Sequence, residues 1–301
     1  MAKIAVDLKR ALMQRDVNGT PGAAAPRIVA CGDGWTVADV VCTSGPGDRI
    51  FEEQHAHYAI AVVVAGTFQY RSTIGGGMMT PGALMLGNPG QRYECGHEHG
   101  RGDRCVAFWY APDYFEALAA SASARRTIPR LVGARLPPLR ELAPFVSRAA
   151  AGVIGAGTIA WEELAVGLAA QVVRVGAGTG RADAALPARG WARITDAVRA
   201  IDRDPASALS LEALARQAGL SPYHFLRLFQ RVTGVTPHQY VLRARLRDAA
   251  ARLTDAPGKI VDVALDCGFG DVSNFTRAFR AEFGVTPRGW RGLSPVASHS
   301  P

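Results

Sequence analysis

Two segments near the C-terminal end of the chain repeat one pattern and constrain the fold more than any other feature. Residues 211–237 and 260–287 share matched alanine, glycine, phenylalanine and arginine positions, and each ends in Gly-Val-Thr-Pro. The offset is 49 residues up to the first matched glycine and 50 residues beyond it, so the connection after that glycine is one residue longer in the second copy. Matched positions of this kind argue against a generic helical bundle and predict two similar folding units.

Each copy predicts two short helices joined by a tight turn. The first helix ends at Gly219 or Gly268, because glycine readily adopts the left-handed backbone that such a turn requires. In the first copy, Ser221 suits the N-cap and Pro222 suits the first position of the second helix. This is the pattern of a helix-turn-helix unit, whose second helix enters the major groove of DNA. The apolar faces of the second helices are expected to be Phe225, Leu228, Phe229 and Val232 in one copy and Phe275, Phe279 and Phe283 in the other.

On these repeated motifs, the region from about residue 190 to residue 292 resembles the DNA-binding domain of the AraC/XylS family. That family joins two such units by a long helix and inserts them into successive major grooves on one face of the DNA. The resemblance places the joining helix at Pro237–Leu253. It implies a sequence-specific transcription regulator that binds double-stranded DNA, contacts RNA polymerase and forms a homodimer.

The second helix of each unit supplies most of the expected DNA contacts. Arg227 and Arg277 occupy equivalent positions, and an arginine can donate two hydrogen bonds to guanine. Asn274 suits adenine or a phosphate, and arginines of the joining helix suit phosphates. The remaining expected contacts are Tyr223, His224, Leu226, Arg231, Arg243, Arg247, Val272 and Ser273.

Charge and composition agree with a DNA partner and narrow the class of protein. The formal net charge is +8 at pH 7, which favours an anionic partner. No run of 18 or more apolar residues occurs and the N-terminus lacks the apolar core of a signal peptide, so we expect a cytoplasmic protein without membrane contact. The 5 cysteines are an odd number in a long chain, which argues against a disulfide scaffold.

The N-terminal part predicts short strands followed by helices. Strands rich in β-branched and aromatic residues, separated by glycine and proline turns, indicate a small barrel or sandwich. The stretch Thr158–Val175 has an apolar helical face, which fits either a core helix or a dimerising helix. We therefore expect an α+β chain with a sensor and dimerisation domain over residues 1–175, a linker over 176–190 and the DNA-binding domain over 191–292. The expected strands are Val37–Cys42, Tyr58–Val64, Thr67–Ser72, Ala83–Leu86 and Arg104–Tyr110.

The strand-rich region resembles the cupin-like sensor domain common in this family. The resemblance rests on His55-Ala-His57, Gly66-Thr-Phe-Gln-Tyr70, Pro81-Gly82 and Asn88-Pro89-Gly90. Metal-binding cupins usually add a glutamate after the paired histidines and a histidine after the second Pro-Gly, where this chain has Ala61-Val62 and Tyr93. The resemblance therefore implies a β-barrel that binds a small-molecule effector rather than an oxygenase. Its expected effector-binding residues are His55, His57, Tyr70 and Tyr93.

A cysteine- and histidine-rich segment, residues 95–105, allows three hypotheses. Thiolate and imidazole are ligands that zinc and other late transition metals prefer, so the segment can hold a metal such as zinc. Alternatively, Cys95 and Cys105 form a redox-active thiol pair, or the segment is a polar turn beside an organic-ligand pocket. The other cysteines, Cys31, Cys42 and Cys267, are expected to be small buried residues. The candidate metal ligands are His55, His57, Cys95, His97, His99 and Cys105.

These features favour a regulator over an enzyme. The leading hypothesis is a DNA-binding transcription regulator whose N-terminal domain senses a small effector or a metal. The alternative from another class is a cupin-type metal-dependent enzyme, or a cysteine that accepts an alkyl group, fused to a DNA-binding module. A third hypothesis is a constitutive DNA-binding protein, whose DNA affinity would ignore every ligand, metal and redox state.

Overall fold

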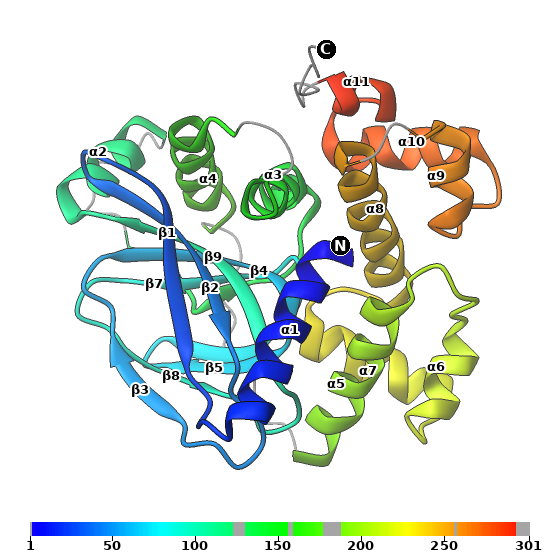
Figure 1. Cartoon of the computed structure of the whole chain (residues 1–301), viewed down its shortest axis with the longest axis horizontal. Helices are drawn as coiled ribbons and strands as arrows, with labels where there is room; N and C mark the ends of the chain where they lie inside the picture. The colour runs from blue at the N-terminus through cyan, green and yellow to red at the C-terminus, as the bar shows by residue number, and fades with distance from the viewer. Residues whose placement is uncertain (1, 123–129, 156–158, 177–187, 256–257, 293–301) are drawn as a thin grey trace.

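The computed structural model describes residues 2–122, 130–155, 159–176, 188–255 and 258–292. Two halves lie side by side in Figure 1: a strand-rich half, residues 2–176, and a helical half, residues 188–292. The predicted α+β class is confirmed. The proposed linker falls mainly on residues 177–187, which lie outside the described residues, so the predicted domain limits stay predictions. Among the described helices, none is long and apolar enough to cross a membrane.

The strands of the strand-rich half form two antiparallel sheets that face one another. One has the order β1-β2-β9-β4-β7-β10 and the other the order β3-β8-β5-β6. Over the described residues these are two open sheets rather than one closed barrel, which corrects the predicted barrel in favour of the sandwich. The strands are β1 (Ala24–Gly32), β2 (Trp35–Cys42), β3 (Phe51–Gln54), β4 (Tyr58–Gly66), β5 (Phe68–Ser72), β6 (Gly75–Met79), β7 (Leu84–Gly87), β8 (Arg92–Gly96), β9 (Asp103–Tyr110) and β10 (Arg135–Leu136).

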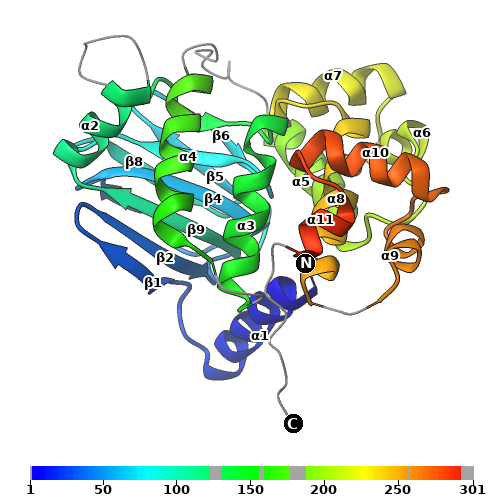
Figure 2. The same cartoon turned by 90° about the horizontal axis from the view of Figure 1, so that it is seen from above.

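The larger sheet is covered on both faces, which explains the continuous apolar run of β4. Successive side chains of a strand point to opposite faces. Ile60 and Val62 belong to the core under the helices, whereas Ala61 and Val63 belong to the core between the two sheets. Figure 2 shows α3 (Ala143–Val153) and α4 (Trp161–Gly176) lying across the outer face of this sheet.

The position of α4 bears on whether the stretch Thr158–Val175 is a core helix or a dimerising helix. The apolar face of α4 is used inside the chain, because Leu164, Leu168 and Val172 are fully buried in the core. This favours the core-helix interpretation, and these side chains are not available to a second copy. The N-terminal helix α1 (Ala2–Asn18), the helix α2 (Pro112–Ala122) and the 3-10 turn η1 (Arg140–Leu142) complete this half.

The helical half contains two cores that share one long helix. The first core surrounds Phe225 and Phe229, and the second surrounds Phe275 and Phe279. The helix α8 contributes Tyr240 to the first core and other apolar residues to the second. The helices are α5 (Ala188–Arg203), α6 (Leu211–Gln217), α7 (Pro222–Thr233), α8 (Pro237–Asp255), α9 (Ile260–Asp266), α10 (Val272–Phe283) and α11 (Pro287–Gly292).

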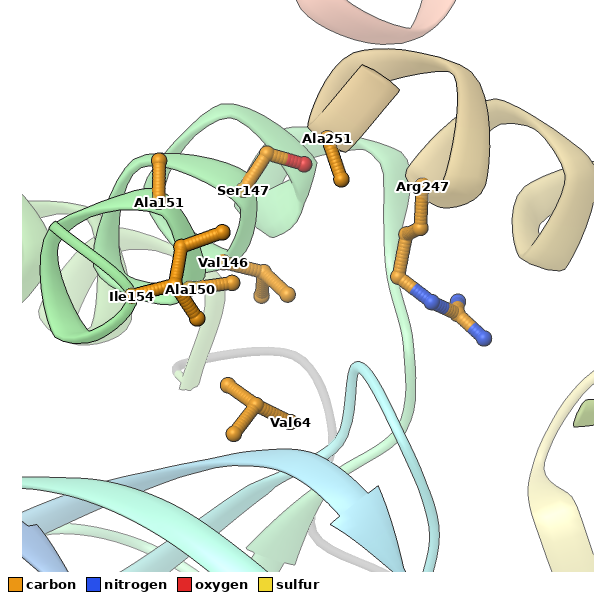
Figure 3. A pocket seen from close by; sticks show the side chains of 8 residues that line it. All are labelled: Val64, Val146, Ser147, Ala150, Ala151, Ile154, Arg247 and Ala251. Atoms are coloured by element: carbon orange, nitrogen blue, oxygen red, sulfur yellow. The ribbon is translucent and has the colours of Figure 1, made fainter. Parts of the chain in front are cut away.

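The two halves pack tightly where α3 faces α8. Figure 3 shows a small space there, bounded by Val64 of the sheet, by side chains of α3, and by Arg247 and Ala251 of α8. Its volume is about 20 Å³, so α3 and α8 meet at this point with almost no empty room between them.

Candidate nucleic-acid interface and buried polar cluster

The first helix-turn-helix unit is built from α6 and α7. Ser210 caps α6 by accepting a hydrogen bond from the Ala213 N–H at 3.1 Å, and Ser221 caps α7 through the His224 N–H at 3.4 Å. Gly219 has a φ of +64°, which an L side chain rarely adopts, so the turn requires glycine at this position. The predicted turn and N-cap are therefore present.

The second unit, α9 and α10, repeats this geometry with one additional residue. Asp271 caps α10 by accepting a hydrogen bond from the Asn274 N–H at 2.6 Å. Gly268 has a φ of +83°, and a Cβ there would lie 2.7 Å from the carbonyl oxygen of Ala206. The longer connection is accommodated by Gly270, which precedes the cap.

Both second helices present polar side chains to solvent. Tyr223 is 61% exposed, and its hydroxyl accepts a hydrogen bond from the Arg227 guanidinium at 3.0 Å. That hydrogen bond raises the pKa of Arg227, and the guanidinium lies 5.8 Å from the centre of the tyrosine ring. Leu226 and Val272 are half-buried. The other exposed side chains on these helices at expected contact positions are His224, Arg231, Ser273, Asn274 and Arg277.

The two second helices border the same surface. Leu226 of α7 and Asn274 of α10 line one cavity of about 550 Å³, together with the start of α8 and the turn at Gly268. A DNA duplex is read by helices that enter its major groove from one side. The placement of α7 and α10 therefore fits the two-groove binding that the repeat predicts.

The two arginines of the joining helix that were predicted to contact DNA, Arg243 and Arg247, are placed differently from the prediction. Arg243 donates a hydrogen bond to the Pro138 carbonyl in the strand-rich half and lies 3.2 Å from Glu282. Arg247 lies 3.5 Å from Asp202 and over the ring of Tyr240. Both side chains are at least partly buried, so the structure does not offer them to phosphate. The alternating arginines of α8 could not reveal this, because a helical pattern does not show which face a second domain will cover.

Comparison with known proteins agrees with this geometry. A family model described as a helix-turn-helix domain matches residues 214–292. The regulatory protein SoxS of Escherichia coli strain K12 is 33% identical over 98 residues, which cover 33% of this chain and 92% of SoxS. The TetD protein of transposon Tn10 from Escherichia coli is 37% identical over 98 residues, which cover 33% of this chain and 71% of TetD. The chain belongs to the AraC family.

The similarity is concentrated in one part of the molecule. The regulatory protein PocR of Salmonella typhimurium strain LT2 is 33% identical over 109 residues, which cover 36% of this chain and 36% of PocR. Because the match spans about a third of PocR, it identifies a DNA-binding domain rather than the activity of the whole protein. The family model does not extend into the strand-rich half of this AraC-family chain.

Three of the four predicted effector residues come together in the strand-rich half. The His55 ring stacks on Tyr93 with centroids 4.1 Å apart, and its Nε2 lies 3.1 Å from the hydroxyl of Tyr70. Burial lowers the pKa of His55 to about 4. A Cβ on Gly87 would lie 2.2 Å from the His55 ring, so this group is closely packed. His57 is exposed, and both histidines lie in the short connection between β3 and β4.

The predicted metal ligands do not form one group. His55 belongs to the tyrosine cluster, His57 is exposed, and Cys95 lies in the core between the sheets. His99 and His97 line a small space that also touches α5. All 5 cysteines are free thiols, and Cys31 is exposed, contrary to the prediction that it is buried.

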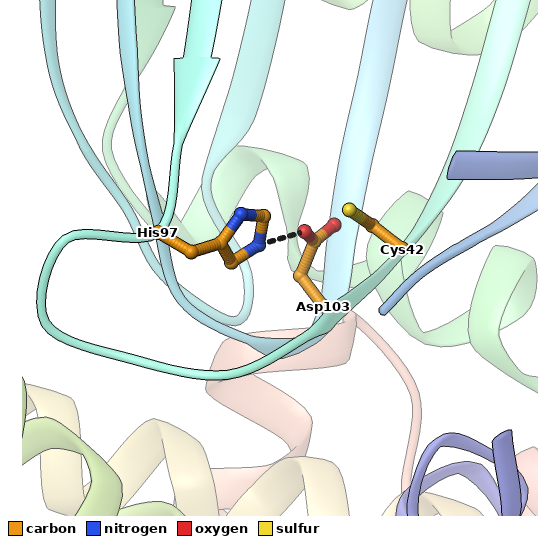
Figure 4. A group of neighbouring side chains, drawn as sticks. All are labelled: Cys42, His97 and Asp103. Atoms are coloured by element: carbon orange, nitrogen blue, oxygen red, sulfur yellow. Dashed lines mark hydrogen bonds and ion pairs between the residues drawn. The ribbon is translucent and has the colours of Figure 1, made fainter. Parts of the chain in front are cut away.

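A different polar group surrounds His97. The ligand atoms of Cys42, His97 and Asp103 all lie within 4.8 Å of one another, and all three residues are buried (Figure 4). His97 Nε2 lies 2.7 Å from Asp103 Oδ1, and the Cys105 thiol donates to Asp103 Oδ2 at 3.3 Å. Burial, followed by the negative charge of Asp103, raises the pKa of the Cys42 thiol to about 11. A buried protonated thiol is a poor nucleophile, which does not favour the alkyl-acceptor alternative for Cys42.

Sequence reasoning did not select two members of this group. Cys42 and Asp103 lie 61 residues apart, and the antiparallel register of β2 and β9 places them directly opposite one another. Asp103 lies within the cysteine- and histidine-rich segment, so the segment itself was a usable signal. Cys42 carries no local signal, because only strand pairing brings it to the site.

Proposed function

We propose that the chain is a sequence-specific DNA-binding transcription regulator, in which the strand-rich half controls how the two helix-turn-helix units are presented. The observation that carries this proposal is that the equivalent arginines Arg227 and Arg277 are both exposed on capped helices of one surface. Membership of the AraC family and the net charge of +8 support binding to DNA.

The first unit is tied to the strand-rich half mainly through its core. Met78 of β6 is buried among the apolar residues of α5, α6 and α7. Thr195 of α5 donates a hydrogen bond to the Met78 sulfur at 3.1 Å, and Arg199 of α5 donates to the Arg101 carbonyl at 3.1 Å. Movement of β6 or of the loop before β9 would therefore move α5 and the α7 that packs on it.

The second unit is tied through charged groups. Glu282 of α10 is buried and pairs with Arg243 of α8 at 3.2 Å and with Arg140 of η1 at 3.8 Å. Arg243 also donates to the Pro138 carbonyl. The strand-rich half thus contacts each unit by a separate route, and a change in that half can alter the relation between α7 and α10.

A cavity at the joint is suited to a small effector. Its volume is about 620 Å³, within the usual range for ligand pockets, and its walls come from both halves. Leu8 and Leu12 of α1 lie on one side, and Arg199, Asp202 and Asp248 lie on the other. A ligand bound between two domains shifts their arrangement only if its affinity for one arrangement is higher than for the other. A ligand that contacts both walls of this cavity would have such a difference in affinity, because its contacts depend on how the two halves are placed.

The test is selection of binding sites from a random duplex library, followed by fluorescence anisotropy with the selected duplex and an unrelated duplex. Arg227→Ala and Arg277→Ala should each weaken binding to the selected duplex by about 1–3 kcal/mol and relax preference at one base pair. Arg92→Ala is the matched control, because Arg92 is exposed on β8 far from α7 and α10 in sequence.

Two results would contradict the proposal. Equal affinity of the wild-type chain for selected and unrelated duplexes would show binding without sequence preference. A uniform loss on both duplexes in the arginine variants would make Arg227 and Arg277 phosphate contacts, because phosphate contacts carry no direct sequence information.

A further inference from the structure

We propose that Cys42, His97 and Asp103 bind a zinc ion, with Cys105 as the fourth protein donor. The inference does not depend on the proposed DNA-binding function. Sulfur, nitrogen and carboxylate oxygen are the donors that zinc takes from proteins, and structural zinc sites are usually four-coordinate. The first three side chains are buried with their donor atoms within 4.8 Å of one another.

The strand pairing builds this group at one end of the sandwich. Cys42 ends β2 and Asp103 begins β9, and the antiparallel register places them opposite one another. Cys105 lies two residues further along β9 and therefore points to the same face as Asp103. His97 follows β8 and reaches the group from the loop before β9, as Figure 4 shows. Three donors thus stand on paired strands and the fourth on a short loop, which is a rigid support for a metal.

Asp103 is the second indication of a metal. It is 5% exposed, and its ion-pair partner among the described residues is His97, which is charged only when protonated. The carboxylate oxygens lie 2.7 Å from His97 Nε2 and 3.3 Å from the Cys105 sulfur, so side chains that can bind zinc already surround it. The thiol protons of Cys42 and Cys105 leave to solvent as the thiolates bind one zinc ion, so the net charge of the group is unchanged and the gain is direct coordination of the buried carboxylate.

For His97 and Asp103 the geometry requires only a small rearrangement. In a tetrahedral zinc site with bond lengths of roughly 2.0–2.2 Å, a nitrogen and an oxygen ligand lie about 3.4 Å apart. His97 Nε2 and Asp103 Oδ1 are 2.7 Å apart, so their hydrogen bond would open by less than an ångström to admit the ion. The Cys105 sulfur is outside the group of donor atoms that lie within 4.8 Å of one another, but it is 3.3 Å from the other carboxylate oxygen, so its side chain would have to turn toward the ion.

The experiment measures zinc in the full-length, untagged chain purified without chelator, followed by cobalt titration of the metal-free protein. We expect about one zinc per chain and a thiolate-to-cobalt charge-transfer band with tetrahedral cobalt absorption. Cys42→Ser and Asp103→Asn should each lower cobalt affinity by roughly 10–100-fold or more, since even partners outside the coordination shell have effects of that size. Cys31→Ser, at the exposed thiol, and Cys95→Ser, at a buried thiol outside the group, are the matched controls and should retain the metal.

A measurement on the unaltered chain guards against variants that fail to fold. X-ray absorption at the zinc edge should show sulfur together with nitrogen or oxygen ligands. The proposal is overturned by absence of zinc and cobalt binding at micromolar concentration, by a shell without sulfur, or by metal lost in Cys95→Ser but kept in Cys42→Ser. None of these results changes the DNA titrations, so failure here and failure of the proposed function are distinguishable.

Discussion

The two helix-turn-helix units share a template but are anchored differently. A carboxylate pairs with an arginine of α8 near each unit: the partly buried Asp202 with Arg247, and the buried Glu282 with Arg243. Asp202 lies on α5, beside the first unit, whereas Glu282 lies on α10, within the second unit. The position equivalent to Glu282 in the first unit is Val232, which is buried in an apolar core.

This difference shows how a repeated sequence can serve two roles. The matched phenylalanines, turn glycines and caps make both units fold alike, since these positions face inward or shape the backbone. The positions that differ between the two copies determine which other parts of the chain each unit contacts. The second DNA-facing helix is held electrostatically to α8 and η1, whereas α7 of the first unit packs through an apolar core that includes Met78.

The largest expected effect tests whether the two cores are equivalent. Phe229 and Phe279 are fully buried, and Phe279 stacks near more aromatic rings, including Phe283 at 4.5 Å. Phe229→Ala and Phe279→Ala should each lower the free energy of unfolding by about 3–5 kcal/mol, with the larger loss at Phe279. Urea denaturation followed by tryptophan fluorescence measures this, because Trp191 packs on the first core and Trp290 lies in the second.

The control for this prediction is Tyr223→Ala, which removes an exposed ring from the same helix as Phe229. It should change stability by no more than about 0.5 kcal/mol, as is usual for surface positions. If either phenylalanine variant lowered the free energy of unfolding by less than about 1 kcal/mol, that unit would not depend on its aromatic core. The two cores would then not be equivalent.

The second prediction concerns Asp202, the carboxylate of α5 beside the first unit. Burial raises the pKa of Asp202 to about 6 despite the opposing effects of Arg247 and the Tyr240 hydroxyl. The folded state then binds a proton that the unfolded state has released, so this group lowers the free energy of unfolding as pH rises from about 4 through 6. The effect is on the order of 3 kcal/mol, because one pKa unit corresponds to about 1.4 kcal/mol.

Comparison with Asp202→Asn isolates this contribution from the other carboxylates. As pH rises from 4 to 6, the free energy of unfolding of the wild type should fall relative to that of Asp202→Asn, because the variant has no carboxyl group to ionise at this position. A difference that stays constant over this interval would mean that Asp202 keeps an ordinary pKa in the folded chain.

The fold of the helical half was largely predictable because its determinants are local. Gly219, Ser221 and the phenylalanine spacing act within one turn of helix, and the repeat supplies the same information twice. The joining helix was predicted at Pro237–Leu253 and is observed at Pro237–Asp255. Its arginines were assigned to phosphate because helical periodicity does not reveal that the strand-rich half covers that face.

The strand-rich half was less predictable because its determinants are pairings between distant residues. Glycines were expected to mark turns between strands, but Gly75, Gly76 and Gly77 lie within β6, which pairs with β5. The helix α1 was not predicted at all. The group around His97 depends on the register that sets Cys42 against Asp103, and register depends on which strands become neighbours rather than on either strand alone.

The third prediction removes the charged anchor of the second unit. Glu282→Val installs the residue found at the equivalent position of the first unit. It leaves Arg243 half-buried, with the Pro138 carbonyl as its remaining hydrogen-bond partner among the described residues. We expect the free energy of unfolding to fall by about 1.5–3 kcal/mol, the usual range for hydrogen bonds to charged groups.

Double-mutant cycles sharpen this result. Arg140 is 60% exposed and lies 3.8 Å from Glu282, so its coupling with Glu282 should be below about 1 kcal/mol. The coupling between Glu282 and Arg243, at 3.2 Å and mostly buried, should be the larger of the two. The reverse order would place the main anchor of α10 on η1 of the strand-rich half rather than on α8.

The smallest expected effects concern the two N-caps. Ser221→Ala and Asp271→Ala each remove a side-chain acceptor for an N–H in the first turn of a DNA-facing helix, and each should cost about 1 kcal/mol. The loss should be larger for Asp271, because its oxygen lies 2.6 Å from the Asn274 nitrogen whereas the Ser221 oxygen lies 3.4 Å from the His224 nitrogen, and because a carboxylate also interacts with the helix dipole. Raising the salt concentration should narrow the difference between the two variants if the dipole is responsible, since salt screens that interaction. A difference that is independent of salt would assign it to hydrogen-bond geometry, and equal losses would mean that the two caps are interchangeable despite their different chemistry.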